Sequence, residues 1–241
     1  MPLNPQVAAP PESYALPRQG CWRNARGVRP ELRAELLCRA EQDQAARRET
    51  EADWKLMTSV DADNLSWLKN IVAEAGWPGR SLVGEDGAHA AWLLAQHADR
   101  DPLFQRKCLD LMTEAAGRGE ASRAELAYLT DRVLLAEGQP QEYGIQMTGR
   151  KEGWVPRRLR DPEHVDRRRA AMGLGSLAEY ITDMERAYGP AKLMRMQCGG
   201  CGDGIDVWPP DEGEELSVTC LACGWSATLV AGAPDEGIGA A

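Results

Sequence analysis

The sequence predicts a mainly α protein in which a compact multi-helix domain is followed by a small β zinc ribbon. Three observations predict this fold class. Between residues 30 and 189, apolar side chains recur every three or four positions, in segments that begin at capping residues. No alternating strand pattern of similar quality precedes residue 190. Beyond it, two Cys-x2-Cys pairs flank short strand-like segments.

The chain of 241 residues can form one domain of ordinary size with a small addition. We expect a flexible, proline-rich N-terminal arm at residues 1–29 and an all-helical domain at 30–189. The zinc ribbon follows at 190–232, and the last residues, 233–241, form a disordered tail.

The first two helices are predicted from the signals at their ends. Pro30 fits the first position of a long helical pattern that continues "ELRAELLCRAEQ". Asp61 or Asp63 is the expected N-cap of the next helix, "NLSWLKNIVAEAG", whose apolar residues recur at helical spacing. Gly76 and Pro78 end this second helix.

Three further helices follow in the middle of the chain. The third, "GAHAAWLLAQHA", is apolar nearly all round, as a buried helix is. The fourth begins at Pro102 with Asp101 as its cap. Ser122 and Glu125 have the capping-box spacing for the fifth helix, which Gly138 ends.

The last helices of the domain begin at equally clear signals. Asp161-Pro162 begins one of them, and Ser176 with Glu179 repeats the capping-box spacing ahead of the other. Gly189 ends the series. Six or seven amphipathic helices with short connections favour a compact helical domain.

Four cysteines near the C-terminus predict a metal site. Cys198 and Cys201 form one Cys-x2-Cys pair, and Cys220 and Cys223 form another, eighteen residues later. Four thiolates supply the tetrahedral cage of a structural zinc ion and leave no coordination position for a substrate. A redox dithiol pair and free thiols are the alternatives, but this spacing is typical of zinc sites. We therefore expect zinc as a structural cofactor.

The residues around these pairs have the pattern of short strands. "GIDVWPPDEGEELSVT" reads as two strands about a turn, and "WSATLVA" reads as a third. Residues 196–232 thus resemble the zinc-ribbon family. A unit of about 30 residues has too little core to fold unaided, so its order is expected to depend on the metal.

The charge of the predicted ribbon has one sign. The chain carries a net charge of −9, and no Lys or Arg occurs from Cys198 to Ala241. Contacts to phosphates need Lys or Arg, so nucleic acid is not expected as a partner. We expect the acidic ribbon to contact the basic segment 150–169 or a basic partner protein.

The sequence also bears on the location of the protein. Its start has no apolar segment of the secretory kind, and no apolar run approaches the ~20 residues that span a bilayer. We therefore expect no membrane association. The cysteine spacing favours metal over disulfides, which is typical of a cytoplasmic protein.

Several polar side chains interrupt apolar patterns where burial is expected. Gln96 and His97 lie near the end of the third helix, and neither has an obvious solvent face. In the first helix, the apolar stripe continues into Asp43, Gln44 and Arg47, which points these residues toward the interior or a cleft. A buried polar group without a partner costs about 1–3 kcal/mol, so specific hydrogen bonds are expected.

A second polar group follows in the fifth helix and in the segment behind it. Asp131 and Arg132 lie beside the apolar stripe of that helix. Tyr143 and Gln146 belong to the extended segment "QEYGIQ", which could close over a pocket. The two histidines other than His97 are expected at the surface.

Six short motifs, taken in order, resemble those of a bacterial helical family of unknown function. They are DQAAR (43–47), DADN (61–64), GWP (76–78), QHAD (96–99), YLTDR (128–132) and YGIQ (143–146). The resemblance spans about residues 32–182, so the ribbon is an addition to the family's usual extent. In that family the last motif is usually Tyr-Gly-Thr-Gln, and Ile145 here lacks the hydroxyl. The resemblance implies a site in the helical domain and no particular reaction.

Two functions remain open. One is an adaptor without enzymatic activity that binds protein through its acidic ribbon. The other is an enzyme for hydrolysis or group transfer on a small polar or anionic substrate, because no nucleotide or redox motif is present. In the enzyme, the catalytic residues are His97, Asp131 and Tyr143, and the substrate-binding residues are Asp43, Gln44, Arg47, Gln96, Arg132 and Gln146.

Purely structural roles are the alternative for all of these residues. His97 could be a core histidine with satisfied hydrogen bonds, and ion pairs alone could explain the charged residues. Convergence of His97, Asp131, Arg132 and Tyr143 around one solvent-open site favours the enzyme. Dispersal into separate ion pairs favours the scaffold.

Overall fold

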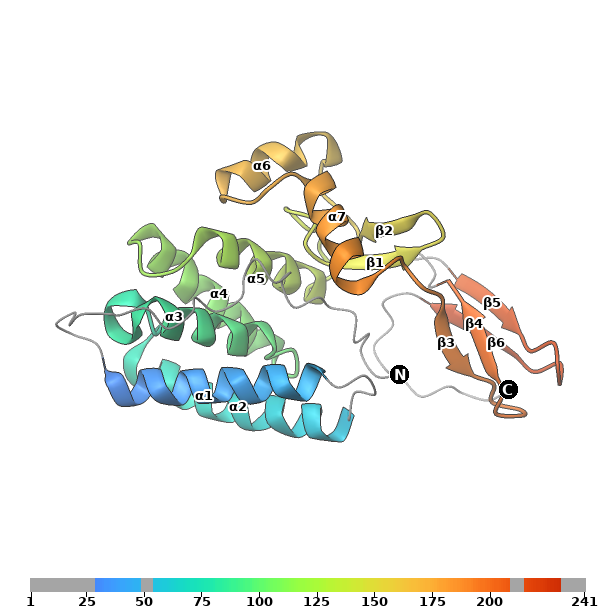
Figure 1. The fold of residues 1–241 in the computed structure, drawn as a ribbon, viewed down its shortest axis with the longest axis horizontal. Coiled ribbons are helices and arrows are strands. Elements are labelled where there is room, and N and C mark those ends of the chain that lie inside the picture. Colours follow the sequence, from blue (N-terminus) through green and yellow to red (C-terminus); the bar gives the residue numbers. More distant parts are fainter. Residues whose placement is uncertain (1–28, 49–53, 209–214, 231–241) are drawn as a thin grey trace.

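The computed structural model describes residues 29–48, 54–208 and 215–230. The predicted C-terminal tail and all but the last residue of the predicted N-terminal arm lie outside these ranges. Within them the chain is mainly α, as predicted, and small antiparallel hairpins follow in the C-terminal part (Figure 1). No helix in the described ranges combines the length and the apolar character needed to cross a bilayer.

The elements follow one another in a simple order. The helices are α1 (Pro30–Arg48), α2 (Trp54–Ala75), α3 (Arg80–Gln96), α4 (Pro102–Gly117), α5 (Arg123–Ala136), the 3-10 helix η2 (Pro162–His164), α6 (Val165–Ala171) and α7 (Leu177–Tyr188). The strands are β1 (Met147–Arg150), β2 (Gly153–Pro156), β3 (Met194–Gln197), β4 (Gly204–Val207), β5 (Glu215–Thr219) and β6 (Ser226–Val230).

Helices α1 to α5 form the body of the molecule. α1 packs against α2 and α3, and α3 also packs against α4 and α5 (Figure 1). Their common core includes the buried side chains of Leu36, Leu68, Trp92, Met112 and Leu129. α3 contacts all four of its neighbours, which explains why its sequence is apolar nearly all round.

Three predicted helix caps are confirmed. Asp101 accepts a hydrogen bond from a backbone N–H in the first turn of α4, and Pro102 follows it. Ser176 and Glu179 form both bonds of a capping box at α7. At α5, Ser122 accepts from the backbone of Glu125, but the Glu125 side chain has another partner.

The predicted start of the second helix is wrong. α2 begins at Trp54, so Asp61 and Asp63 lie inside it and cap nothing. Both carboxylates pair with arginines of α1. Arg47 Nη2 is 2.7 Å from Asp61 Oδ1, and Arg39 Nη1 is 2.6 Å from Asp63 Oδ2. Residues that the sequence suggests as caps thus join two helices.

α3 also begins earlier than its predicted segment. A single turn starts at Arg80, and a kink at Gly84 separates it from the rest of the helix. Gly84 has φ 76°, a left-handed value that glycine adopts without steric cost. The predicted segment begins only beyond this kink, so it misses the first turn, in which Val83 is already buried.

The domain predicted to be all-helical contains a two-stranded hairpin. β1 and β2 pair in antiparallel register, with Thr148 opposite Val155. Each strand has four residues, and the first three of β1 are all buried, so no apolar–polar alternation marks them. Trp154 is buried, and its Nε1–H donates to Gly189 O at 3.0 Å, which joins the hairpin to the end of α7.

The C-terminal part consists of two antiparallel hairpins, β3–β4 and β5–β6. The sequence predicts three strands here, and β3 is the additional one. Met196, Val218 and Leu229 are buried together and join the two hairpins, with Trp225 packed against them. So small an apolar cluster is insufficient to hold a fold without another constraint.

Candidate functional site

The third helix ends in a histidine that faces a buried carboxylate. His97 is the C-cap of α3, and its Nδ1 lies 2.9 Å from each carboxylate oxygen of Asp43 on α1. The Asp43 side chain is 0 % exposed and that of His97 is 9 % exposed. A carboxylate can only accept hydrogen bonds, so Nδ1 carries a proton and Nε2 is left for other partners.

Arg47 joins this pair to a second carboxylate. Its Nη1 is 2.8 Å from Asp43 Oδ1, and its Nη2 is 2.7 Å from Asp61 Oδ1 on α2. Gln44 Nε2 donates to Asp43 Oδ2 at 2.9 Å. Burial raises the pKa of Asp43, but His97 and Arg47 outweigh it and hold the pKa below its usual range. The pKa of Asp61 is raised, because burial outweighs its bond to Arg47.

Two residues beyond His97, Asp99 forms a two-point ion pair with Arg132 of α5. Nε and Nη2 of Arg132 lie 2.8 Å from the two carboxylate oxygens. Gln105 of α4 donates to Asp99 Oδ1 at 3.1 Å. Burial raises the pKa of Asp99, but Arg132 lowers it to about 2, with a smaller contribution from His97. His97 and the Asp99–Arg132 pair therefore belong to one electrostatic unit.

Together these side chains form a single group, which we call the His97 cluster. Its members are Asp43, Gln44, Arg47, Asp61, His97, Asp99, Gln105 and Arg132. One carboxylate oxygen each of Asp43 and Asp61 and one ring nitrogen of His97 lie within 4.8 Å of one another, close enough to bind a common metal ion or proton. The cluster draws on the motifs DQAAR, DADN, QHAD and YLTDR, and it contains five of the nine residues predicted for the helical site.

Two residues predicted to be catalytic lie outside this cluster. The buried Asp131 accepts hydrogen bonds from the backbone N–H groups of Glu142, Tyr143 and Ile145, at 2.8 to 3.2 Å. Among the described residues, neither Asp131 nor Tyr143 has a hydrogen bond or ion pair with His97. Their contacts indicate that Asp131 shapes the segment that follows α5. The convergence of His97, Asp131, Arg132 and Tyr143 that favours an enzyme is therefore not observed, and a site in this domain rests on the His97 cluster alone.

Gln146 and Gln96, both predicted to bind substrate, also remain apart from the cluster. The side chain of Gln141 forms two hydrogen bonds with the backbone of Gln146. Its Oε1 accepts from Gln146 N at 2.6 Å, and its Nε2 donates to Gln146 O at 2.9 Å. The Gln96 side chain is buried, and its Oε1 has no hydrogen-bond partner among the described residues. The specific partner expected for the Gln96 side-chain oxygen is therefore not found.

The sequence predicts no site role for three members of the cluster, Gln105 and the two aspartates Asp61 and Asp99. The two aspartates lie within the motifs DADN and QHAD. An aspartate near a helix start is typical of a cap, and an aspartate after a helix is typical of a turn. Their ion pairs cross from one helix to another, and no local pattern reports such a contact.

A second histidine–carboxylate pair joins α3 to α5. His89 Nδ1 is 2.7 Å from Glu125 Oε1, and the side chains are 17 % and 13 % exposed. The His89 ring centroid lies 5.2 Å from that of Trp92. The expected surface position is therefore wrong for His89. It is confirmed for His164, which is exposed and pairs with Asp161.

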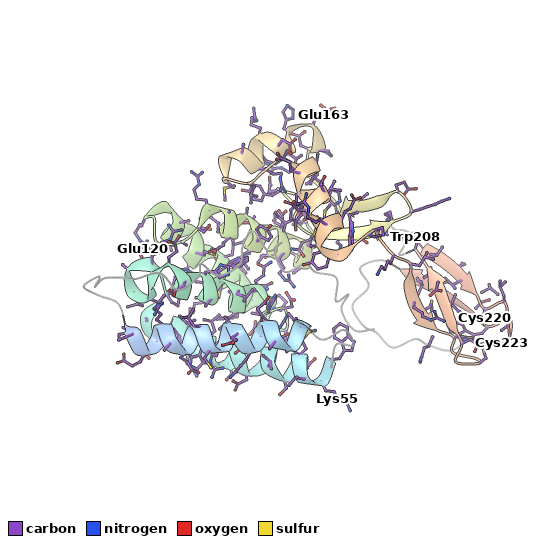
Figure 2. The ribbon with its side chains drawn as sticks, in the orientation of Figure 1. Lys55, Glu120, Glu163, Trp208, Cys220 and Cys223 are labelled. Carbon is purple, nitrogen blue, oxygen red and sulfur yellow. The ribbon has the colours of Figure 1, made fainter. Side chains whose placement is uncertain are left out.

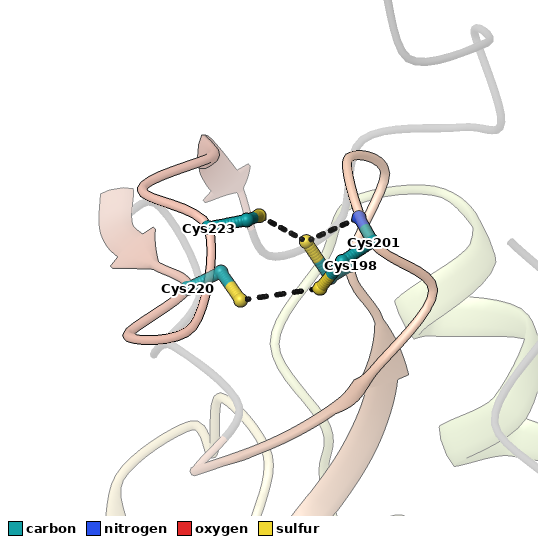
Figure 3. Close-up of side chains that lie close together, drawn as sticks. All are labelled: Cys198, Cys201, Cys220 and Cys223. Atoms are coloured by element: carbon teal, nitrogen blue, oxygen red, sulfur yellow. Dashed lines mark hydrogen bonds between the residues drawn. The ribbon is translucent and has the colours of Figure 1, made fainter.

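The four cysteines of the ribbon converge, as Figure 3 shows. Cys198 Sγ is 3.4 Å from Cys223 Sγ, and Cys201 Sγ is 3.7 Å from Cys220 Sγ. In a tetrahedral site with metal–sulfur bonds of ~2.3 Å, the sulfurs lie about 3.8 Å apart. A disulfide would need ~2.05 Å. The spacing therefore fits one metal ion held by four thiolates and is too long for disulfides.

The two cysteine knuckles share one backbone geometry. Gly202 N donates to Cys198 O at 2.9 Å, and Gly224 N donates to Cys220 O at 2.8 Å. Both glycines have positive φ, 80° and 78°, which other residues rarely adopt. Desolvation raises the pKa of the Cys198 thiol, but backbone N–H groups of its knuckle lower it to about 6. This geometry favours the thiolate of Cys198, whereas burial and the neighbouring thiols raise the pKa of Cys201 and Cys223.

The ribbon lies apart from the His97 cluster. Figure 2 shows Cys220 and Cys223 at the end of the ribbon that points away from α1–α5. In the basic segment, Arg160 and Arg168 pair with Glu142 of the helical domain at 2.7 and 3.5 Å. Docking of the acidic ribbon onto this segment stays a prediction.

Comparison with known proteins identifies a family for the helical domain. A family model described as a family of unknown function (DUF6624) matches residues 30–193. The match includes α1 to α7 and ends before β3, so all four cysteines of the ribbon lie beyond it. No curated protein and no solved structure matches the chain.

Proposed function

The chain belongs to the DUF6624 family of unknown function, and we propose that its helical domain is an enzyme site for acid–base catalysis. The reaction is hydrolysis or group transfer on a small polar substrate. One observation carries the proposal, the contact of His97 Nδ1 with the buried Asp43 carboxylate. Histidine changes its charge near neutral pH, and a buried carboxylate partner is the usual means of orienting a catalytic imidazole.

His97 transfers the proton in this proposal. Asp43 holds the Nδ1–H and so fixes the ring in one tautomer, with Nε2 as the basic nitrogen. Nε2 takes a proton from water or from a substrate hydroxyl, and the same nitrogen returns it to the leaving group. Asp43 stabilises the imidazolium between these steps, while Gln44 and Arg47 keep the carboxylate ionised and in place.

The cluster favours a polar substrate without negative charge. Arg47 binds the carboxylates of Asp43 and Asp61, and Arg132 binds that of Asp99 at two points. An anion would have to draw a guanidinium from its partner, and an unpaired buried charge costs about 3–5 kcal/mol. The sequence-based suggestion that arginines hold an anionic ligand is therefore replaced by a polar, uncharged or cationic substrate.

Substitution of His97 tests the proposed activity. His97→Gln retains an N–H group that can donate to Asp43, so the fold should persist while the base is lost. With a panel of chromogenic esters, amides and glycosides, we expect turnover to fall by about 100-fold or more. His164→Gln, at an exposed histidine, is the matched control and should keep full turnover. Full turnover in His97→Gln would contradict the proposal.

We further infer that the four cysteines bind a structural zinc ion. Protein thiolates fill all four positions, so the metal holds the fold and contacts no substrate. Such a site persists in a reducing compartment, which supports a cytoplasmic protein. Elemental analysis should find one zinc per chain and its loss in Cys201→Ser. Cys38→Ser, at an exposed cysteine of α1, should keep the metal.

An exposed leucine supports the adaptor as a second function, carried by the ribbon. Leu221 lies between the cysteines of the second knuckle and is fully exposed. No Lys or Arg occurs from Cys198 onward, so a partner surface would combine apolar and basic groups. Binding to a basic model polypeptide should weaken as salt rises, and Leu221→Ser should weaken it without zinc loss. Binding that does not depend on salt would contradict this function.

A further inference from the structure

The His97 cluster contains more negatively charged groups than positively charged ones. It contains three carboxylates, those of Asp43, Asp61 and Asp99, and the two guanidinium groups of Arg47 and Arg132. One negative charge is therefore in excess when the His97 ring is neutral. An uncompensated charge away from water is costly, so the cluster favours one additional positive charge.

The hydrogen bonds show where this charge belongs. Both oxygens of Asp43 accept from two donor groups, and both oxygens of Asp99 bind Arg132. Asp61 accepts from Arg47 through Oδ1 alone, and its Oδ2 has no hydrogen bond among the described residues. The Asp61 side chain is 16 % exposed, so Oδ2 is the one carboxylate oxygen of the cluster that is left for a proton or water.

We infer that Asp61 is the second proton-carrying group of this site, and that it shares one proton with His97. The inference rests on the proposed acid–base function and adds a residue to it. With the proton on His97, Asp61 is a carboxylate and the ring is an acid. With the proton on Asp61, His97 Nε2 is a free base. The two states have the same total charge, so the proton moves between them without any other charge being added.

The size of the excess charge argues for a proton over a metal ion. A divalent ion near Asp43, Asp61 and His97 would reverse the sign of the excess and would compete with Arg47 for both carboxylates. A single proton cancels the excess and leaves every ion pair in place. Burial raises the pKa of Asp61, which is the direction that proton sharing requires.

All charged groups around His97 enter the expected titration. Asp43 and Arg47 face it from α1 and Asp61 from α2, while the Asp99–Arg132 pair follows α3 and lies on α5. Asp43 and Asp99 keep their negative charges because arginines hold them. Within the cluster, therefore, we expect the shared proton on His97 or on Asp61, whose Oδ2 has no other partner among the described residues.

Nuclear magnetic resonance of the zinc-loaded full chain tests this inference. The His97 ring and the Asp61 carboxyl carbon are followed across pH in the wild type. Since the two groups are coupled, both signals should report the same two steps. In Asp61→Asn, whose amide still accepts from Arg47, the His97 signals should change in one step, and the protonated fraction of the ring at neutral pH should fall about tenfold.

Matched variants exclude a purely structural effect of Asp61. Asp61→Glu restores the charge and should return the His97 titration toward the wild type. Asp63→Asn removes an exposed carboxylate from the same helix and should leave it unchanged. Selective broadening of the His97 signals by Mn2+ would favour a metal and overturn the inference. The inference would also be overturned if the Asp61 carboxyl signal changed only at acid pH and independently of the His97 signals. Because no turnover is measured, these outcomes are distinct from a failure of the proposed activity.

Discussion

At the scale of single residues, the Asp43 carboxylate is the centre of the helical site. It is fully buried and accepts hydrogen bonds from His97, Arg47 and Gln44. The apolar stripe of α1 indicates that Asp43 points inward, so its burial could be predicted. Its contact with His97 could not, because His97 lies at the end of α3 and only packing brings it to α1.

Loss of the Asp43 charge should strongly destabilise the helical domain. Asp43→Asn keeps the shape of the side chain but leaves Arg47 and His97 without their buried anion. Breaking one partner of such a pair costs about 3–5 kcal/mol. We expect the free energy of unfolding, measured in urea, to fall by about 3 kcal/mol. Asp63→Asn, at an exposed interhelical pair, should lose less than about 1 kcal/mol, and equal losses would contradict this role.

Asp99 should make the stability depend on pH in the acid range. Arg132 lowers the pKa of Asp99 from 3.8 to about 2 in the folded chain. The ion pair therefore stabilises the fold fully above pH 3.8, and this contribution is lost as the pH falls toward 2. The side chain is 35 % exposed, and solvent screening reduces the effect to about 1 kcal/mol. Between these pH values, the free energy of unfolding measured in urea should fall less in Asp99→Asn than in the wild type. The same dependence of this free energy on pH in both proteins would contradict the ion pair.

At the scale of elements, the segment after α5 is held by buried polar groups and has little regular structure. Asp131 accepts from its N–H groups, and Arg169 Nη1 donates to Tyr143 O at 2.7 Å. Tyr180 donates from its hydroxyl to Ile145 O at 3.1 Å. Such groups satisfy the backbone of a loop as a sheet or helix would. Residues that resemble a site in the sequence thus fix the path of this segment.

Removal of the Asp131 charge should loosen this segment selectively. Asp131→Asn replaces an anionic acceptor by a neutral amide whose nitrogen cannot accept at all, so some backbone N–H groups lose their partner. We expect hydrogen exchange at Glu142, Tyr143 and Ile145 to accelerate by about 10-fold or more, which corresponds to a loss of about 1.4 kcal/mol. Asp110→Asn, at an exposed position of α4, is the control. Unchanged exchange in Asp131→Asn would show that the segment needs no such anchor.

The elements also show which parts of the fold local sequence can predict. Capping residues such as Asp101, Ser122 and Ser176 act through the turn that follows them, and their predictions are confirmed. The start of α2 and the hairpin β1–β2 could not be predicted in this way, because their side chains form hydrogen bonds and ion pairs with residues far away in the sequence. Asp61 pairs with α1 and Trp154 bonds to the end of α7, and such contacts leave no periodic pattern.

At the scale of the whole molecule, the chain has two apolar cores of very different size. The larger core unites the helices and the β1–β2 hairpin, and the smaller one joins the two C-terminal hairpins. The family match ends at residue 193, between these two cores. The ribbon thus lies beyond the part of the chain that the family shares, and its independence from the helical domain stays a prediction.

The two parts should therefore respond differently to removal of the metal. The ribbon core contains Met196, Val218 and Leu229, too few apolar side chains to offset the loss of chain entropy. In the proposed site, zinc bound by four thiolates would supply the missing free energy, so a chelator at neutral pH should abolish hydrogen-exchange protection at residues 194–208 and 215–230. Peptides from α1 to α5 should keep theirs, because their core contains no metal ligand from the ribbon.

Two variants separate loss of the metal from loss of a cysteine as such. Cys201→Ser should reproduce the effect of the chelator without its addition, since three thiolates hold zinc far more weakly than four. Cys38→Ser, on the exposed face of α1, should leave both parts protected. A chelator that loosens the helices as much as the ribbon would mean that the parts fold as one unit. Full protection of the ribbon after complete metal removal would mean that its apolar contacts suffice, which the size of its core argues against.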